Sequence, residues 1–256
     1  MTDIAIRARQ EDIAFQEKLY NDPNPTRRGL HRARREWIEN HLRFYVAAGS
    51  KVIEVGVGCG VFTRFLSDLG ASTIAVDINQ SFLDGVAGLR GVSVRNADAT
   101  QGLGCEDRDL VLCSEVLEHV PPSQSQEMLM QLAKALRPGG TLILTTPQRF
   151  ATVELVARLF KFRPVLAVAR MIYGTAEELG HTNLLTKREL KRQIFKTGLQ
   201  IKEERIFGFY LPVLAEFGGG IGARVLKYAG QVISRIPIVR GLIWTQAYVL
   251  SKPTQS

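Results

Sequence analysis

Three glycines at alternate positions follow a short apolar run near residue 51. The segment Lys51–Phe65 reads KVIEVGVGCGVFTRF, with Glu54 just before the glycines and a helical pattern after them. These features predict a strand, a tight turn and the start of a helix. Glycines allow positive φ and a close approach by a ligand, because no Cβ is in the way. The turn at Gly56, Gly58 and Gly60 is therefore predicted to lie against a bound molecule, and Glu54 is predicted to contact the same molecule.

Three interpretations of this turn compete. A dinucleotide site has the pattern G-x-G-x-x-G, but here the third glycine comes one position early and Val61 stands in its expected place. A phosphate-binding P-loop ends in Gly-Lys-Ser or Gly-Lys-Thr, which this chain does not contain. The third interpretation is a structural turn between strand and helix with no ligand. Residues further along the chain bear on the choice.

Acidic residues follow the next two predicted strands. The buried strand STIAVD ends at Asp77, roughly twenty residues beyond the glycines, where an acid can accept hydrogen bonds from a ribose diol. Ile78 follows and is placed to cover one face of an adenine. The third strand leads to Asp98, expected to accept from the adenine amino group, and to Ala99, expected to line its pocket. Either acid alone would fit a solvated turn, but together at successive strand ends they indicate one ligand.

Several motifs resemble one enzyme family. The pattern E-x-G-x-G-x-G resembles the first motif of the class I S-adenosylmethionine (SAM) dependent methyltransferases. Asn24–Gly29 (NPTRRG) and Leu117–Val120 (LEHV) are similar to segments of the ubiquinone-biosynthesis O-methyltransferases and the methyltransferase type 11 group. Leu136–Gly140 (LRPGG) before a strand is typical of class I enzymes. Carried by residues 24–147, the resemblance implies SAM as cofactor and a three-layer α/β/α sandwich with a Rossmann-like, seven-stranded, mostly parallel sheet and an antiparallel last strand.

The resemblance also gives a role to one arginine. Arg27 occupies the arginine position of the N-P-x-R-x-G motif, and by that resemblance it holds the methionine carboxylate of SAM. A planar, permanently charged guanidinium suits this role. The cluster Arg27, Arg28, Arg32, Arg34 and Arg35 is otherwise typical of a solvated helix face, and the cofactor role is assigned to Arg27 alone.

The fourth predicted strand, in DLVLCSEVLEHV at residues 109–120, ends beside the cofactor turn. Ser114 at its carboxyl end is expected to contact the cofactor. His119 is the candidate general base, because its usual pKa is near neutrality and a hydroxyl acceptor loses a proton as the methyl group arrives. Glu115 and Glu118 are expected to orient His119, or to bind a divalent cation with it, as the resemblance alone implies. Alternatively, the Glu-His pair simply caps the next helix.

The composition is that of an ordinary soluble globular protein: 256 residues, 45% hydrophobic and 23% charged. No signal-peptide pattern or membrane-length apolar run stands out, so the expected compartment is the cytoplasm. Cys59, Cys105 and Cys113 are too few for a disulfide framework or a zinc site, so no structural metal is predicted. The net charge of +8 and pI near 9.6 favour an anionic partner without choosing among nucleic acid, lipid and substrate.

Residues 148–180 mix an apolar stripe with several cations. Basic amphipathic helices often lie on anionic membranes, so this segment is a candidate membrane contact that would place the protein on the inner membrane face. A lid helix over the active site is the alternative. Tyr173 and His181 flank glycine hinges here and are candidate substrate contacts.

The predicted organisation is one methyltransferase domain, residues 51–256, with insertions at 148–185 and 211–240, preceded by N-terminal helices, residues 1–50, that contribute to a lid. The expected function is SAM-dependent methyl transfer to a small hydrophobic acceptor, at a hydroxyl oxygen. A catalytically silent SAM-binding protein and an RNA methyltransferase are the alternatives. No RNA-binding module is recognisable, which argues against nucleic acid as a partner, and the Asn/Asp-Pro-Pro-aromatic motif of DNA amino-methyltransferases is absent.

Overall fold

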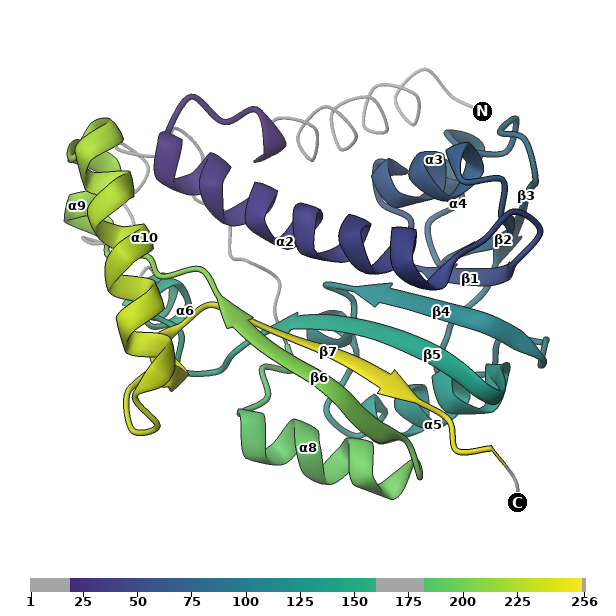
Figure 1. Ribbon diagram of the computed structural model, residues 1–256. Coiled ribbons are helices and arrows are strands. Elements are labelled where there is room, and N and C mark those ends of the chain that lie inside the picture. The colour runs from purple at the N-terminus through teal and green to yellow at the C-terminus, as the bar shows by residue number, and fades with distance from the viewer. Residues whose placement is uncertain (1–18, 160–181, 255–256) are drawn as a thin grey trace.

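A seven-stranded sheet forms the centre of the protein, in a computed structural model that describes residues 19–159 and 182–254. The strands run in the order β3-β2-β1-β4-β5-β7-β6 (Figure 1). β7 is antiparallel to both of its neighbours, whereas the other paired strands are parallel. The predicted fold class is therefore confirmed. The strands are β1 (Lys51–Val55), β2 (Ser72–Asp77), β3 (Val92–Asn96), β4 (Arg108–Ser114), β5 (Leu136–Pro147), β6 (Gln200–Phe207) and β7 (Thr245–Ser251).

Helices cover both faces of the sheet. In Figure 1, α2, α3 and α4 lie above it and α5 and α8 below it, which gives three layers. α9 and α10 stand at the side toward which the arrowheads of β4, β5 and β6 point. The helices are α2 (Pro25–Tyr45), α3 (Val61–Asp68), α4 (Gln80–Asp84), α5 (Ser125–Ala135), α6 (Thr152–Leu159), α8 (Lys187–Lys196), α9 (Pro212–Phe217) and α10 (Gly219–Arg235), with short 3-10 turns η1 (Leu117–His119) and η2 (Arg240–Leu242).

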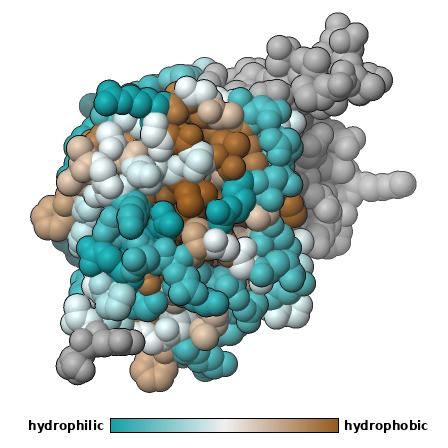
Figure 2. All heavy atoms as spheres, turned by 90° about the vertical axis from the view of Figure 1, so that its right-hand side faces the viewer, coloured by the Kyte–Doolittle hydropathy of each residue, from teal (hydrophilic) through white to brown (hydrophobic). Residues whose placement is uncertain are grey.

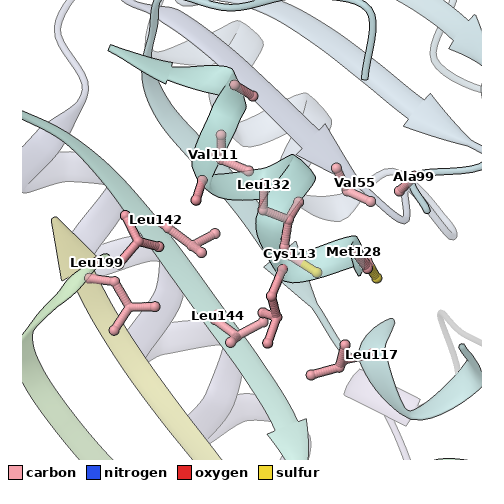
Figure 3. Close-up of a cluster of buried hydrophobic side chains, with 14 of the residues drawn as sticks. Val55, Ala99, Val111, Cys113, Leu117, Met128, Leu132, Leu142, Leu144 and Leu199 are labelled. Carbon is pink, nitrogen blue, oxygen red and sulfur yellow. The ribbon is translucent and has the colours of Figure 1, made fainter. Parts of the chain in front are cut away.

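The core divides between the two faces because successive side chains of a strand point in opposite directions. Val52 of β1 packs on the side of α2 and α3, whereas its neighbour Ile53 packs on the side of α5 and α8. Figure 3 shows this second cluster, in which Leu132 of α5 lies close to Cys113 of β4. Cys113 and Cys59 are buried free thiols, as expected from the sequence.

α2 is tied to the sheet by its apolar stripe. Asn24 caps the helix by accepting from the backbone N–H groups of Thr26 and Arg27, and Pro25 occupies the first turn. Ile38 and Leu42 are fully buried against β1 and α3, as their spacing predicts. The helix therefore runs over the same sheet that carries the glycine turn.

Two predicted element boundaries differ from the structure. β5 begins at Leu136, which pairs with Arg108, and the next paired residue is Thr141 opposite Leu110. Residues 137–140 form a bulge in this strand, whereas the sequence predicts that they end the preceding helix and that the strand begins at Thr141. The last strand, predicted from Leu242 to Ser251, begins at Thr245 and is preceded by η2. Residues 211–240, predicted as a loop or helix, form α9, α10 and η2.

The part of the chain proposed as a lid or membrane contact is described only in part. α6 covers its first residues, and Tyr173 and His181 lie outside the described residues. Among the described helices, none has the length and hydropathy needed to cross a bilayer. The side of the molecule away from α9 and α10 shows one group of apolar side chains framed by hydrophilic ones (Figure 2).

Candidate active site

The glycine turn between β1 and α3 has the backbone that its sequence predicts. Gly56, Gly58 and Gly60 have φ of 81°, 53° and 75°, the left-handed region that disfavours residues with a Cβ. A Cβ added at Gly56 would also collide with Val116, and one at Gly60 with Val86. Two separate constraints, conformation and space, therefore require glycine at both positions.

Gly56→Ala is expected to weaken binding of S-adenosylhomocysteine at least tenfold and to lower the unfolding free energy by about 1–2 kcal/mol. The reason is the cost of a left-handed alanine together with displacement of Val116. Calorimetric titration and chemical denaturation measure the two effects. Gly88→Ala is the control, because Gly88 has no neighbour within 4 Å of an added Cβ and no positive φ. Equal effects at the two positions would contradict this account of the turn.

Asp77 lies at the carboxyl end of β2 and closes the glycine turn. Its Oδ2 accepts from the backbone N–H of Val57 at 2.8 Å, and its Oδ1 accepts from the backbone N–H of Asn79 at 2.8 Å. Oδ2 also lies 3.5 Å from the backbone N–H of Gly58, whereas Oδ1 retains a further lone pair for a ligand. The structure thus brings Asp77 together with the glycine turn, and its contact with the ribose stays a prediction.

The residues assigned to the adenine lie on the two neighbouring loops. Ile78 is 75% exposed, an unusual position for a large apolar side chain directly after a buried strand. Asn96 donates to the backbone carbonyls of Asp77 and Ile78 and so joins the loop after β3 to the loop after β2. Asp98 accepts from the backbone N–H and hydroxyl of Thr100, and Ala99 is buried. The predicted adenine contacts therefore come from adjacent loops at one edge of the sheet.

Glu54 is buried beneath the turn rather than exposed at it. The hydroxyl of Thr63 in α3 donates to its Oε2 at 2.6 Å. Burial raises the pKa of Glu54 to about 8, so the carboxyl is mostly neutral at pH 7. This side chain links β1 to α3 and holds the turn from below. Its predicted contact with the cofactor remains a prediction.

The loop after β4 carries a strained acid that pairs with α2. Glu115 has φ of 56°, one of two positive values among described non-glycine residues. Its Oε2 lies 2.7 Å from Nη1 of Arg34, and its Oε1 accepts from the hydroxyl of Thr145 at 3.0 Å. Ser114 contacts the same hydroxyl at 3.0 Å. Such backbone strain persists where surrounding contacts hold it, and it occurs often at functional sites.

The other two members of the predicted catalytic trio differ in burial. Glu118 is buried, and its Oε2 accepts from the hydroxyl of Thr146 at 3.1 Å. Burial, and then the charge of Glu115, raises the pKa of Glu118 well above its usual value, which favours the protonated form. His119 ends η1 with an exposed side chain. The roles of Glu115, Glu118 and His119 in catalysis stay predictions.

The same three residues do not assemble a metal site. Among the described residues there is no group of three or more His, Cys, Asp or Glu side chains arranged to hold a metal ion. The Glu115 carboxylate is neutralised instead by the guanidinium of Arg34. The donor set therefore does not fit the divalent cation that the resemblance implied.

Arg27, assigned to the methionine carboxylate, is held by two acids. Its Nε lies 2.8 Å from Asp22 Oδ2, and its Nη1 lies 2.7 Å from Glu216 Oε2 in α9. These contacts tie the start of α2 to α9. The cofactor role of Arg27 stays a prediction, and it would require the guanidinium to exchange or share these partners.

Sequence reasoning missed Arg34, which was placed with the solvated arginines. That expectation is wrong for Arg34, whose side chain is buried at the carboxyl edge of the sheet. The missed signal is spacing, because Arg34 precedes Ile38 and Leu42 by four and eight residues and so shares their buried face. A buried guanidinium at this position needs a charged partner, and Glu115, which is distant in sequence, is that partner.

Arg34 belongs to a cluster of buried polar groups with unused hydrogen-bonding atoms. Nε of Arg34, Nδ1 of His31 and Nε1 of Trp244 are each buried without a hydrogen-bond partner among the described residues. The rings of His31 and Trp244 lie 5.2 Å apart, and the Arg34 guanidinium lies 6.0 Å from the Trp244 ring. Burial, and then the charge of Arg34, lowers the pKa of His31 to about 3, so its imidazole is neutral. We call His31, Arg34 and Trp244 the α2 polar cluster.

Comparison with known proteins identifies relatives in sequence. The family described as "Methyltransferase domain" matches residues 30–204. A ubiquinone biosynthesis O-methyltransferase from Burkholderia pseudomallei (strain 1710b) is 30% identical over 208 residues, covering 77% of this chain and 84% of that protein.

Solved structures agree on the fold. An N-methyltransferase, NodS, from Bradyrhizobium japonicum WM9 in complex with S-adenosyl-L-homocysteine matches with a TM-score of 0.59 and 16% identity, covering 96% of this chain and 97% of that one. The [4+2]-cyclase SpnF matches with a TM-score of 0.56 and 14% identity, covering 86% and 81%. At such identities the likeness shows the fold alone.

Proposed function

This chain belongs to the SAM-dependent methyltransferases, and we propose that it transfers the methyl group of SAM to a hydroxyl oxygen of a small hydrophobic acceptor. The support for oxygen is the name of the relatives that match 30% identically over most of the chain. The further support comes from the way the site is built.

The observation that carries the proposal is the contact between the glycine turn and the loop after β4. An added Cβ at Gly56 would meet the Val116 side chain, so the two loops lie within van der Waals distance. Val116 stands between Glu115 and the η1 turn that ends at His119. A cofactor seated on the turn would therefore have these polar side chains beside it.

The α2 polar cluster is the proposed binding site for the acceptor. A buried nitrogen without a partner is costly, and a ligand oxygen would satisfy it. Nε of Arg34 and Nε1 of Trp244 are both donors, and neutral His31 can donate or accept. Such a group can hold a polar oxygen of an acceptor whose remaining surface is apolar.

In this mechanism the protein mainly positions the reactants. SAM supplies an activated methyl group on a good leaving group. The chain's own residues hold the acceptor in line with that methyl group and exclude water, which lowers the entropic part of the barrier. His119 receives the acceptor proton. The ion pair between Glu115 and Arg34 fixes the loop that leads to His119.

His119→Gln is expected to lower kcat by about 10²-fold or more, the usual contribution of a general base, with little change in KM for SAM. The decrease should be smaller at high pH, where the acceptor hydroxyl ionises unaided. Steady-state formation of S-adenosylhomocysteine across a pH series measures this. His41→Gln is the control, because His41 pairs with Glu203 of the edge strand β6 and has no part in the proposed site. Unchanged turnover in His119→Gln would remove the base assignment.

A matched acceptor series tests the proposal itself. Hydrophobic phenols and the anilines and thiophenols of the same shape are incubated with the protein and SAM, and products are identified by mass spectrometry. We expect O-methylated products to predominate. Methylation confined to nitrogen, sulfur or carbon acceptors would contradict the assignment to oxygen while leaving the methyltransferase activity intact.

A further inference from the structure

α10 presents large apolar side chains to solvent. Ile221, Val225, Tyr228 and Val232 follow one another at intervals of four, three and four residues, so they form one stripe along the helix. Ile221 and Tyr228 are 70% and 71% exposed, and the other two side chains are also exposed. We call these four residues the α10 stripe. An exposed stripe of this kind is unusual, since scattered single residues are the normal case.

The protein-facing side of the same helix is built from glycines and one leucine. Gly222 and Leu226 are buried, and Leu226 joins the small core cluster with Tyr210 and Ala215. A Cβ at Gly222 would collide with the backbone of α9, and one at Gly230 would come within 3.0 Å of the Phe209 Cβ. The glycines let α10 sit close to the body of the protein. The fold therefore uses these residues for packing and leaves the α10 stripe without a role in it.

Apolar exposure continues beyond both ends of the helix. Phe217 at the end of α9 is 72% exposed and Ile238 after α10 is 93% exposed, and Ile236 lies between Ile238 and the helix end with its side chain exposed as well. The exposed apolar side chains thus extend along the chain from α9 through α10 to the turn before η2.

Cations accompany the stripe and acids do not. Arg224, Lys227 and Arg235 are exposed on α10, and none of them pairs with a carboxylate within the described residues. The chain contains no Asp or Glu after Glu216. An apolar stripe beside unpaired cations is complementary to an interface where negative headgroups overlie hydrocarbon.

We propose that the α10 stripe docks this protein onto anionic phospholipid membranes, with α10 lying in the plane of the interface. Figure 1 shows α10 at the outer side of the molecule, at the edge where the parallel strands end and next to the start of α2. A membrane bound there would adjoin the side of the protein that carries the candidate active site. The α10 stripe consists of other residues than the segment 148–180 that the sequence suggested, and the proposal does not depend on the identity of the acceptor.

Co-sedimentation of the full chain with vesicles tests the proposal. One set contains phosphatidylcholine alone, and the other contains phosphatidylcholine with 30% phosphatidylglycerol. We expect binding to the anionic vesicles, at least tenfold weaker binding to the neutral ones, and weakening by high salt. The variant Ile221→Ser/Tyr228→Ser should lose at least tenfold in affinity. Arg224→Gln/Lys227→Gln/Arg235→Gln should lose the preference for anionic vesicles.

Phe195→Ser provides the matched control. Phe195 is 83% exposed on α8, which lies on a different side of the molecule from α10, and its loss should leave vesicle binding unchanged. Thermal unfolding and S-adenosylhomocysteine titration should be unaltered in all variants, which separates membrane docking from cofactor binding. Equal loss in the control, no binding by the unmodified chain, salt-sensitive binding to RNA in place of vesicles, or a dimer that the α10 variant abolishes without any vesicle binding would each overturn the proposal.

Discussion

Asp77→Ala should weaken the binding of S-adenosylhomocysteine by roughly 100-fold or more, because hydrogen bonds to a charged group contribute about 1.5–3 kcal/mol each. Calorimetric titration measures the loss. Asp84→Ala is the matched control, since Asp84 is an exposed acid at the end of α4, the helix that follows β2. Affinity retained in Asp77→Ala would remove the assignment of this carboxylate to the ribose.

A second ligand separates direct contact from support of the turn. Asp77 accepts from the backbone N–H groups of Val57 and Asn79, so its removal also disturbs the loops around it. An analogue of S-adenosylhomocysteine without the 2′-hydroxyl should bind the unmodified protein weakly. If Asp77 holds that hydroxyl, the affinities of the analogue and of the natural ligand should differ much less in Asp77→Ala than in the unmodified protein. An undiminished difference would mean that Asp77 acts only through the turn.

Arg34→Met should lower the unfolding free energy by about 3 kcal/mol, the lower end of the cost of removing one partner of a buried ion pair. The variant leaves the Glu115 carboxylate without its cation in a position where the backbone is already strained. Urea denaturation in the presence and in the absence of cofactor measures the loss of unfolding free energy. Methyl transfer should fall as well, because Glu115 fixes the loop that leads to His119.

The adjacent arginine is a control within the same helix. Arg35 pairs with Glu39 one turn along α2 at 2.6 Å, its own side chain is 41% exposed, and such pairs within a helix contribute at most about 1 kcal/mol. Arg35→Met should therefore be nearly neutral. The double variant Arg34→Met/Glu115→Gln should lose less stability than the sum of its two single changes, because it removes both charges together. Strict additivity would show that Arg34 and Glu115 do not interact energetically.

The sheet could be predicted from sequence because its signals are local. β1 and β2 are short apolar runs bounded by a glycine turn and an acid, and β2 has the expected limits, Ser72–Asp77. The capping box at Thr186 and Glu189 likewise marks the start of α8. The bulge at 137–140 could not be predicted in the same way, because Leu136 becomes part of β5 only through its pairing with Arg108 on another strand.

The residues of the cofactor site could be predicted from sequence, whereas only some residues of the proposed acceptor site could. The glycines and the acids at strand ends have fixed places in chain order, so spacing brings them together. The partnership of Arg34 with Glu115, and its approach to Trp244, join segments separated by long stretches of chain. The spacing of Arg34 with Ile38 indicates its burial, but no local pattern indicates its partners.

The position of β7 has a consequence for how the chain acquires its structure. β6 precedes β7 in sequence, yet it pairs only with β7, which lies between β6 and β5. During synthesis, strands β1 to β5 and the helices between them can assemble while β6 still has no partner. The emerging edge of β5 would remain open until residues 245–251 leave the ribosome, an interval in which an unpaired strand is prone to aggregate. Completion of this sheet is thus a late, non-local step, and chaperone dependence should concentrate there.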